Sequence, residues 1–260
     1  MSATHFWKYQ GTGNDFVMID NRAGFPHASD SEIKKLCDRR FGIGADGLIY
    51  LEKSDVADFR MVYFNSDGLE STFCGNGGRC IAAFAKLLDV FEGNSTRFIA
   101  KDGLHEAEIK GENIRLKMRD VSEIQENELG HELFTGSPHL IVQVQNVDTV
   151  EVKTKGANIR YSERYQNEGI NVNFIEQTGD EVWVRTYERG VEDETLSCGT
   201  GVTAAALVMG RLGMASPVAV ETQGGKLMVE FSKQANGGFT EVFLIGPAEK
   251  VFEGEITYLV

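Results

Sequence analysis

Short apolar stretches separated by polar turns run along most of the 260-residue chain. Glycine together with asparagine or acidic residues punctuates them, as in K-G-E-N, T-G-D-E and A-N-G-G. Apolar runs bounded by such turn residues are typical of short β-strands. The pattern predicts strands at residues 58–64, 97–100, 105–109, 113–118, 140–145, 172–176, 181–187, 218–222, 226–231 and 241–245.

Two other stretches have the apolar spacing of helices. The first runs from Arg79 to about Val90 and has an apolar face formed by Ile81, Phe84, Ala85 and Leu88. The second, G-V-T-A-A-A-L-V-M-G-R-L-G, is apolar on nearly all sides, which is typical of a buried helix. Gly213 is expected to end it as a C-cap.

The two halves of the chain repeat one pattern. G-T-G-N-D-F-V-M-I-D at 11–20 opens an apolar strand, and T-G-S-P-H-L-I-V-Q-V at 135–144 does the same. Residues 59–77 and 182–201 each read as a strand, a polar turn and C-G-x-G. The interval from Asn14 to Ser137 nearly equals that from Cys74 to Cys198. We therefore expect an internal duplication.

These elements predict an α+β protein with two pseudo-symmetric halves. Each half is expected to be a curled mixed or antiparallel sheet, a barrel-like roll, around a central helix, with the active site in the cleft between the halves. We expect residues 1–119 to form the N-terminal half, with Cys74, and residues 120–249 the C-terminal half, with Cys198. A last strand at about 250–260 is expected to pack with the N-terminal half.

Composition narrows the classes of function. The formal net charge of −13 argues against binding to nucleic acids or anionic membranes, which requires a basic surface. No apolar stretch is long enough to span a bilayer, and no secretory signal is evident, so we expect a cytoplasmic protein. The four cysteines form no C-x-x-C pair and the five histidines do not cluster near them, so we expect no metal site.

The paired C-G-x-G segments suggest a reaction. A helix N-terminus presents backbone N–H groups and the positive end of a dipole, and glycines let a ligand approach the backbone. Such a site holds a carboxylate or phosphate, and it lowers the pKa of a cysteine there from about 8.5 to roughly 7 or below. The alternative interpretation is that both cysteines are inert core residues that merely begin buried helices. We expect Cys37 and Cys80 to be inert core residues.

Two thiols on opposite sides of a cleft suit the inversion of a carbon. One rigid base cannot reach both faces, whereas a thiolate can remove a proton from one face and a thiol can return one to the other. The helix N-termini would stabilise the charge that develops on the substrate carboxylate. This scheme needs neither a metal nor a Schiff-base lysine, so we expect no cofactor.

The motifs F-C-G-N-G-G-R-C, S-C-G-T-G, G-T-G-N-D-F and Y-E-R-G together resemble those of the diaminopimelate epimerase family, in order over essentially the whole chain. The resemblance implies an isomerase that interconverts L,L- and meso-diaminopimelate without pyridoxal phosphate, in lysine and cell-wall precursor biosynthesis. It also implies a cytoplasmic homodimer.

The resemblance assigns roles by motif. Cys74 and Cys198 match the cysteines that transfer the proton. The loops that hold the reacting carboxylate match Gly75, Asn76 and Gly77 with Gly199, Thr200 and Gly201. Other substrate contacts match Asn14, Asn65, Asn171, Glu188 and Arg189, where Glu188 lies near the substrate ammonium and Arg189 binds the distal carboxylate. His139 is expected to orient Glu188 or a cysteine, or to be a structural histidine.

Two positions depart from the family pattern. Ser137 stands in G-S-P-H where much of the family has a substrate-binding asparagine, and Gly47 stands where some members have glutamine. Both departures concern recognition of the distal end of the substrate. Two alternatives remain open: a proline or hydroxyproline racemase of similar build, and a non-catalytic anion-binding module.

Overall fold

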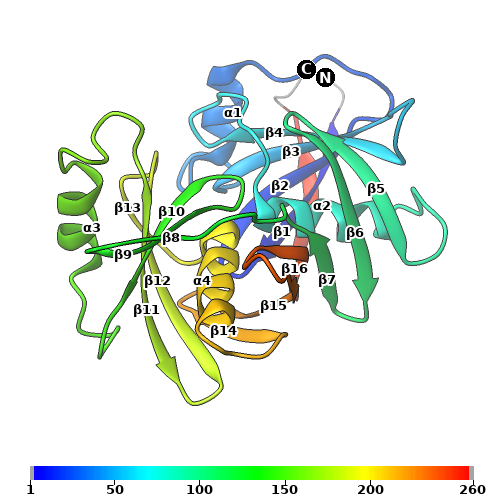
Figure 1. Ribbon diagram of the computed structural model, residues 1–260. Coiled ribbons are helices and arrows are strands. Elements are labelled where there is room, and N and C mark those ends of the chain that lie inside the picture. The colour runs from blue at the N-terminus through cyan, green and yellow to red at the C-terminus, as the bar shows by residue number, and fades with distance from the viewer. Residues whose placement is uncertain (1–2, 258–260) are drawn as a thin grey trace. The chain divides into compact units, whose positions relative to one another are not determined.

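The computed structural model describes residues 3–257 and shows a mixed α+β protein composed mostly of strands, with four helices in that range (Figure 1). Contacts between Cα atoms divide the chain into two units. One comprises the described residues up to Leu116 and from Pro247 onward, and the other comprises Lys117–Gly246. Each unit is described by itself.

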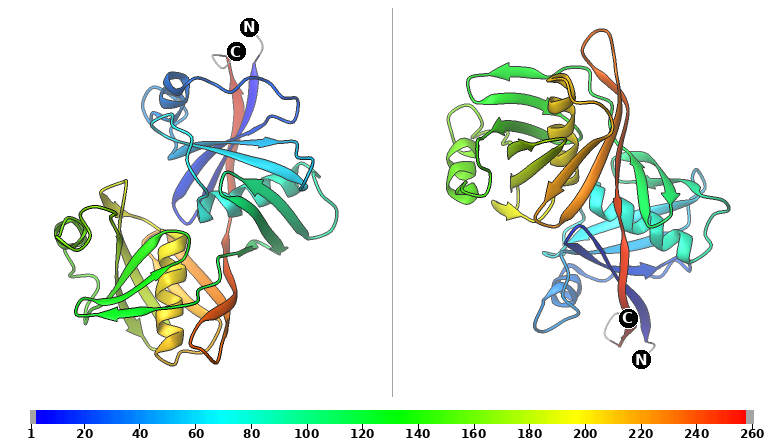
Figure 2. Two further views of the ribbon diagram at one scale, coloured as in Figure 1. Left: turned by 45° about the horizontal axis from the view of Figure 1, so that its top comes forward. Right: turned by 90° about the horizontal axis from the view of Figure 1, so that it is seen from below.

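The first unit is a sheet with two helices. Its elements are β1 (Thr4–Gly11), β2 (Asn14–Asp20), α1 (Asp30–Cys37), β3 (Gly47–Glu52), β4 (Phe59–Asn65), α2 (Gly75–Leu87), β5 (Ser95–Ala100), β6 (Gly103–Lys110), β7 (Asn113–Lys117) and β17 (Glu249–Ile256). Strand β1 pairs with both β2 and β17, so the last strand of the chain lies beside the first (Figures 1 and 2). The final residues of the expected strand at 250–260 lie outside the described range.

The second unit is built in the same way. Its elements are β8 (Gln125–Asn127), β9 (Gly130–Phe134), β10 (Pro138–Gln143), α3 (Val152–Arg160), β11 (Asn171–Thr178), β12 (Glu181–Glu188), β13 (Asp193–Thr195), α4 (Gly199–Arg211), β14 (Val218–Thr222), β15 (Gly225–Lys233) and β16 (Phe239–Pro247). Helix α4 packs against β9, β10, β11, β12, β14 and β15 (Figure 2).

The order of strand pairing is the same in the two units. In the first unit the pairs β1/β2, β2/β3, β3/β4, β4/β5, β5/β6 and β6/β7 are antiparallel, parallel, antiparallel, parallel, antiparallel and antiparallel. The pairs β9/β10, β10/β11, β11/β12, β12/β14, β14/β15 and β15/β16 repeat that order in the second unit. Helices α2 and α4 occupy equivalent positions in the two series.

All ten strands predicted from the apolar pattern overlap observed strands. The predicted start of the first helix is wrong by one turn, because α2 begins at Gly75 and ends at Leu87. Its first turn, G-N-G-G, has low intrinsic helix propensity, but all four residues are buried, so packing holds them in the helix. Helix α4 is buried along nearly its whole length, and Gly213, with φ of +115°, follows its C-cap.

Candidate active site

Both cysteines singled out by the sequence are helix N-caps. Cys74 precedes α2 and Cys198 precedes α4, and both have extended backbone conformations. The backbone carbonyl of each accepts the first hydrogen bond of its helix, from Gly78 at 2.7 Å and from Val202 at 2.8 Å. Cys74 is half-buried and Cys198 is buried. Each sulfur therefore lies beside a helix terminus whose N–H groups favour a negative charge.

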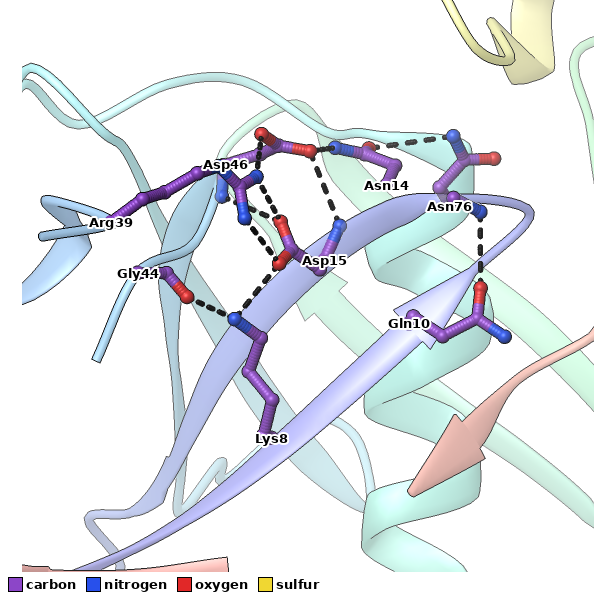
Figure 3. Close-up of polar contacts among 9 residues, drawn as sticks. Lys8, Gln10, Asn14, Asp15, Arg39, Gly44, Asp46 and Asn76 are labelled. Carbon is purple, nitrogen blue, oxygen red and sulfur yellow. Dashed lines mark hydrogen bonds and ion pairs between the residues drawn. The ribbon is translucent and has the colours of Figure 1, made fainter. Parts of the chain in front are cut away.

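In the first unit, Asn14 connects Cys74 to a carboxylate. Figure 3 shows Asn14 between Asp46 and Asn76. The Asn14 amide nitrogen donates to Asp46 Oδ2 at 2.6 Å. Its oxygen accepts from Asn76 Nδ2 at 3.3 Å and from the Cys74 thiol at 3.6 Å. Asn14 from one motif and Cys74 and Asn76 from another, all predicted as site residues, are thus brought together.

Behind Asn14 lies a cluster of four charged side chains (Figure 3): Lys8, Asp15, Arg39 and Asp46. Arg39 binds both oxygens of Asp15 at 2.7 and 2.9 Å and one oxygen of Asp46 at 2.8 Å. The buried ammonium of Lys8 contacts Asp15 at 2.8 Å and donates to the carbonyl of Gly44. Burial alone would raise the pKa of Asp15, but hydrogen bonds from Arg39 and Lys8 lower it to about 2.

Asn65 lies at the same end of the sheet as Asn14. It ends β4 and pairs with Gly47, which pairs in turn with Phe16 of β2. A β-carbon on Gly47 would lie 2.5 Å from the carbonyl oxygen of Phe64 and 2.6 Å from the ring of Tyr63. A glutamine at this position would therefore require the backbone of β4 or the ring of Tyr63 to shift.

In the second unit, a chain of polar side chains leads to Cys198. Thr200 Oγ1 lies 3.4 Å from the Cys198 sulfur and 2.9 Å from His139 Nε2. His139 Nδ1 lies 3.0 Å from the amide nitrogen of Asn173, which also donates to the carbonyls of Leu140 and Asn171. Because carbonyls only accept, the NH₂ of Asn173 faces the ring, and Nδ1 of a neutral His139 must accept from it.

His139 is neutral over a wide pH range. It is completely buried, and burial together with the positive charge of Arg189 lowers its pKa to about 3. With Nδ1 accepting, the ring carries its proton on Nε2 and donates it to Thr200. The hydroxyl hydrogen of Thr200 is then available to the sulfur of Cys198.

Asn171, Ser137 and Arg189 form a second group in this unit. Asn171, which is buried, donates to Ser137 Oγ at 2.8 Å and to the carbonyl of Pro138 at 2.9 Å, and it accepts from the backbone of Arg189 at 2.9 Å. The Arg189 guanidinium donates to the carbonyl of Glu168 at 2.8 Å and to Ser137 at 3.4 Å. Neighbouring Glu188 accepts from Thr195 at 2.9 Å.

The other two cysteines have different surroundings. Cys37 and Cys80 are buried, and burial raises the pKa of each to about 12. Such thiols are unreactive near neutral pH. All four cysteines are present as thiols rather than disulfides.

Sequence reasoning missed Asp46, Arg39 and Asn173. Asp46 and Arg39 reach Asn14 and Asp15 across a loop and a neighbouring strand, so no local pattern connects them. Asn173 had a signal, because in N-V-N-F it lies two positions after Asn171, on the same face of a strand.

No group of three or more His, Cys, Asp or Glu in the described residues is arranged to hold a metal ion. Within the same range, no helix has the length and apolar character needed to cross a membrane.

Comparisons with known proteins place this arrangement in a family. A family model described as diaminopimelate epimerase matches residues 6–123 and 133–251. The diaminopimelate epimerase of Flavobacterium psychrophilum is 54% identical over 255 residues, covering 96% of this chain and 99% of its own. That of Chlorobaculum tepidum is 47% identical over 258 residues, covering 95% and 99%.

Solved structures show the same fold at much lower identity. A PhzF-family phenazine biosynthesis protein from Bacillus anthracis aligns with a TM-score of 0.73 at 19% identity, over 99% of this chain and 100% of that one. A hydroxyproline epimerase from Agrobacterium vitis aligns with a TM-score of 0.68 at 14% identity, over 99% and 93%. The family model and the full-length relatives give one consistent assignment: this chain belongs to the diaminopimelate epimerase family.

Proposed function

We propose that this protein interconverts L,L- and meso-diaminopimelate by two-base proton transfer between Cys74 and Cys198. Membership of the family supplies the reaction class, an isomerase of lysine biosynthesis. The observation that carries the mechanism is the equivalence of the two cysteines, since each is the N-cap of the corresponding helix in a duplicated unit. The contrast with the other two cysteines supports this mechanism, because burial raises the pKa values of Cys37 and Cys80 to about 12.

In the proposed reaction, one cysteine is a thiolate and the other a thiol. The thiolate removes the α-proton, and the electron pair of the broken C–H bond moves onto the substrate carboxylate. The thiol then donates its proton to the opposite face of the same carbon. Each turnover exchanges the protonation states of the two sulfurs, so no net proton is consumed and the reverse reaction uses the exchanged roles.

The two helix N-termini are proposed to stabilise the carboxylate charge. Backbone N–H groups of Gly75, Asn76 and Gly77 and of Gly199, Thr200 and Gly201 belong to the first turns of α2 and α4, where such groups lack helical partners. A β-carbon on Gly201 would lie 2.3 Å from Asn173 Oδ1, so packing as well as ligand approach requires glycine there. These N–H groups would act as an oxyanion hole, because they would stabilise the negative charge that develops on the substrate carboxylate.

Recognition of the distal amino-acid group is proposed to involve Asn65, Asn171, Ser137 and Arg189, and Asn14 and Glu188 are proposed as further substrate contacts. The Ser137 hydroxyl is hydrogen-bonded to Asn171 and Arg189. Although serine is shorter than the asparagine found in much of the family, it therefore contacts the same proposed recognition residues. Arginine suits the distal carboxylate because its planar fork can bind two oxygens. Glu188 would attract the substrate ammonium.

We also propose that each sheet curls into a barrel-like roll around its central helix. Helix α2 contacts β1, β2 and β3, which are neighbours in the order of strand pairing, and also β6, which lies three strands further along that order, so these contacts support the curl in the first unit. The further proposal of a homodimer is supported by exposed apolar side chains on β17, Val251 and Phe252. A cytoplasmic location would keep the two thiols reduced.

The alternatives predict other substrates or none. A proline or hydroxyproline racemase would not need Arg189 and the asparagine set, and an anion-binding module would not need cysteine at both helix starts. The deciding experiment incubates the purified protein with L,L-diaminopimelate in heavy water, with reductant and without added cofactor. We expect uptake of α-deuterium and formation of the meso isomer. Uptake with L-proline instead would favour the first alternative, and no uptake with either substrate would refute the proposed function.

A further inference from the structure

The orientation of the Asn14 amide is determined by a neighbouring charge. An amide has an oxygen that accepts and a nitrogen that donates, and the two ends can be exchanged by a flip. A carboxylate only accepts, so the end of Asn14 that lies 2.6 Å from Asp46 Oδ2 must be the NH₂ group. The amide oxygen therefore faces Cys74 and Asn76.

Asp46 is itself fixed from both sides. Its Oδ1 accepts from Arg39 at 2.8 Å, and its Oδ2 accepts from the backbone of Asp15 at 3.2 Å as well as from Asn14. The backbone N–H of Asp46 donates in turn to the Asp15 carboxylate at 3.0 Å. Arg39 and the buried Lys8 hold Asp15, so the whole cluster is neutral and interlocked (Figure 3).

We propose that Asp46 is a positioning residue for epimerisation, because it fixes Asn14 with its oxygen toward Cys74 and so favours the proton-donating thiol at that position. This inference rests on the proposed function for its meaning in catalysis. An oxygen acceptor beside a sulfur stabilises the S–H form and opposes the thiolate. If the amide flipped, its NH₂ group would face the sulfur and stabilise the thiolate instead.

The second unit differs at the equivalent point. The residue two positions after Cys198 is Thr200, a hydroxyl that lies 3.4 Å from the sulfur. The residue two positions after Cys74 is Asn76, whose amide nitrogen turns to Asn14. Cys74 thus faces an amide oxygen that only accepts, whereas Cys198 faces a hydroxyl that can donate, so the surroundings of the two thiols are unequal.

Other charges act on Cys74 and must stay constant in a test. Arg79, fully buried on α2, interacts electrostatically with both Cys74 and Cys80, and its charge favours a thiolate. The cluster beside Asn14, formed by Lys8, Asp15, Arg39 and Asp46, adds two positive and two negative charges. A variant of Asp46 alone leaves Arg79 and the helix terminus in place.

The test is the substitution Asp46→Asn in a Cys198→Ala background. The substitution keeps the shape of the side chain but replaces one of its two oxygens with an NH₂ group. Asp46 uses one oxygen for Arg39 and the other for Asn14, so an asparagine no longer enforces the orientation of the Asn14 amide. The readout is the pH dependence of Cys74 alkylation by iodoacetamide, to which Cys37 and Cys80 contribute little below pH 10 because burial raises their pKa values to about 12. We expect the midpoint to fall by about 0.5–1 pH unit, the size of one modest hydrogen bond.

A matched control is Asp20→Asn, at the other end of β2. Asp20 binds Arg22 through two hydrogen bonds, as Asp15 binds Arg39, and it does not contact Asn14. It should leave the midpoint unchanged. Asp46→Ala is a second variant that removes the acceptor altogether and should shift the midpoint in the same direction, with thermal unfolding confirming that each variant is folded.

A double-mutant cycle with Asn14→Ala separates positioning from simple loss of charge. If Asp46 acts through Asn14, Asp46→Asn will have no further effect on the midpoint once Asn14 is alanine. An equal shift with and without Asn14, or no shift in either Asp46 variant, would overturn the proposal. These titrations need no substrate, so they remain decisive even if the wild-type protein fails to epimerise diaminopimelate, a result that would refute the proposed function instead.

Discussion

The hydroxyl oxygen of Thr200 lies 3.4 Å from the sulfur of Cys198. Because His139 donates to the same oxygen, the hydroxyl hydrogen can point to the sulfur and stabilise its thiolate. We predict that Thr200→Val raises the alkylation midpoint of Cys198 by about 1 pH unit in a Cys74→Ala background and lowers epimerase turnover about tenfold in the otherwise wild-type chain. Thr200→Ser keeps the hydroxyl and should restore most of both properties. Equal midpoints for the valine and serine variants would contradict the assignment.

The charge cluster behind Asn14 should make stability depend on acid pH. The folded-state pKa of Asp15 is lowered from 3.8 to about 2, so its contribution is fully present above pH 3.8 and is lost as pH falls through about 2. At pH 7, Asp15→Asn should cost at least roughly 2 kcal/mol in the free energy of unfolding, since it also leaves the buried Lys8 without its carboxylate. Urea unfolding at a series of pH values should show the two proteins converging near pH 2. A constant difference down to that pH would show that the charge of Asp15 is not responsible.

His139 should remain neutral throughout the pH range of activity. Because burial lowers its folded-state pKa from 6.5 to about 3, the unfolded chain binds the proton first, and this residue destabilises the fold progressively as pH falls from 6.5 toward 3. Nitrogen chemical shifts of labelled histidine should show the proton on Nε2 at pH 7 and no titration down to about pH 4. A titration near pH 6.5, or a proton on Nδ1, would contradict the hydrogen-bond chain from Asn173 to Thr200.

Gly47 should not accept the glutamine that some family members have. A β-carbon there would approach backbone and ring atoms closer than 3 Å, so Gly47→Gln must displace β4 or the ring of Tyr63. We expect a loss of about 1–3 kcal/mol in the free energy of unfolding, the usual range for overpacking a core, and Gly47→Ala should lose a similar amount. Urea unfolding measures both. Full stability of the glutamine variant together with tighter substrate binding would mean that distal recognition, not space, decides this position.

The sequence allowed the strands and both cysteine helices to be predicted because apolar periodicity and turn residues are local signals. Helices α1 and α3 were not predicted, since they are short and bury only three and two residues, too few to give a clear apolar periodicity. The start of α2 was misplaced because G-N-G-G has poor helix propensity and is held by burial. At the candidate site, motifs identified the residues that could touch substrate, whereas Asp46 and Arg39 depend on pairing between β2 and a distant loop. Such long-range polar contacts leave no periodic trace in a sequence.

The central claim is that two cysteines, not one base, invert the α-carbon. Its most direct test is the early reaction of L,L-diaminopimelate in heavy water, with deuterium measured separately in the meso product and in recovered substrate during the first few per cent of turnover. In the two-thiol mechanism, the donating thiol has exchanged its proton with solvent and adds deuterium to the face opposite the thiolate. We therefore expect deuterium at the α-carbon of the product and almost none in recovered substrate. Cys74→Ala and Cys198→Ala should each abolish formation of the product. Product that retains the original proton, or a single-cysteine variant that still forms labelled product, would contradict the two-thiol mechanism.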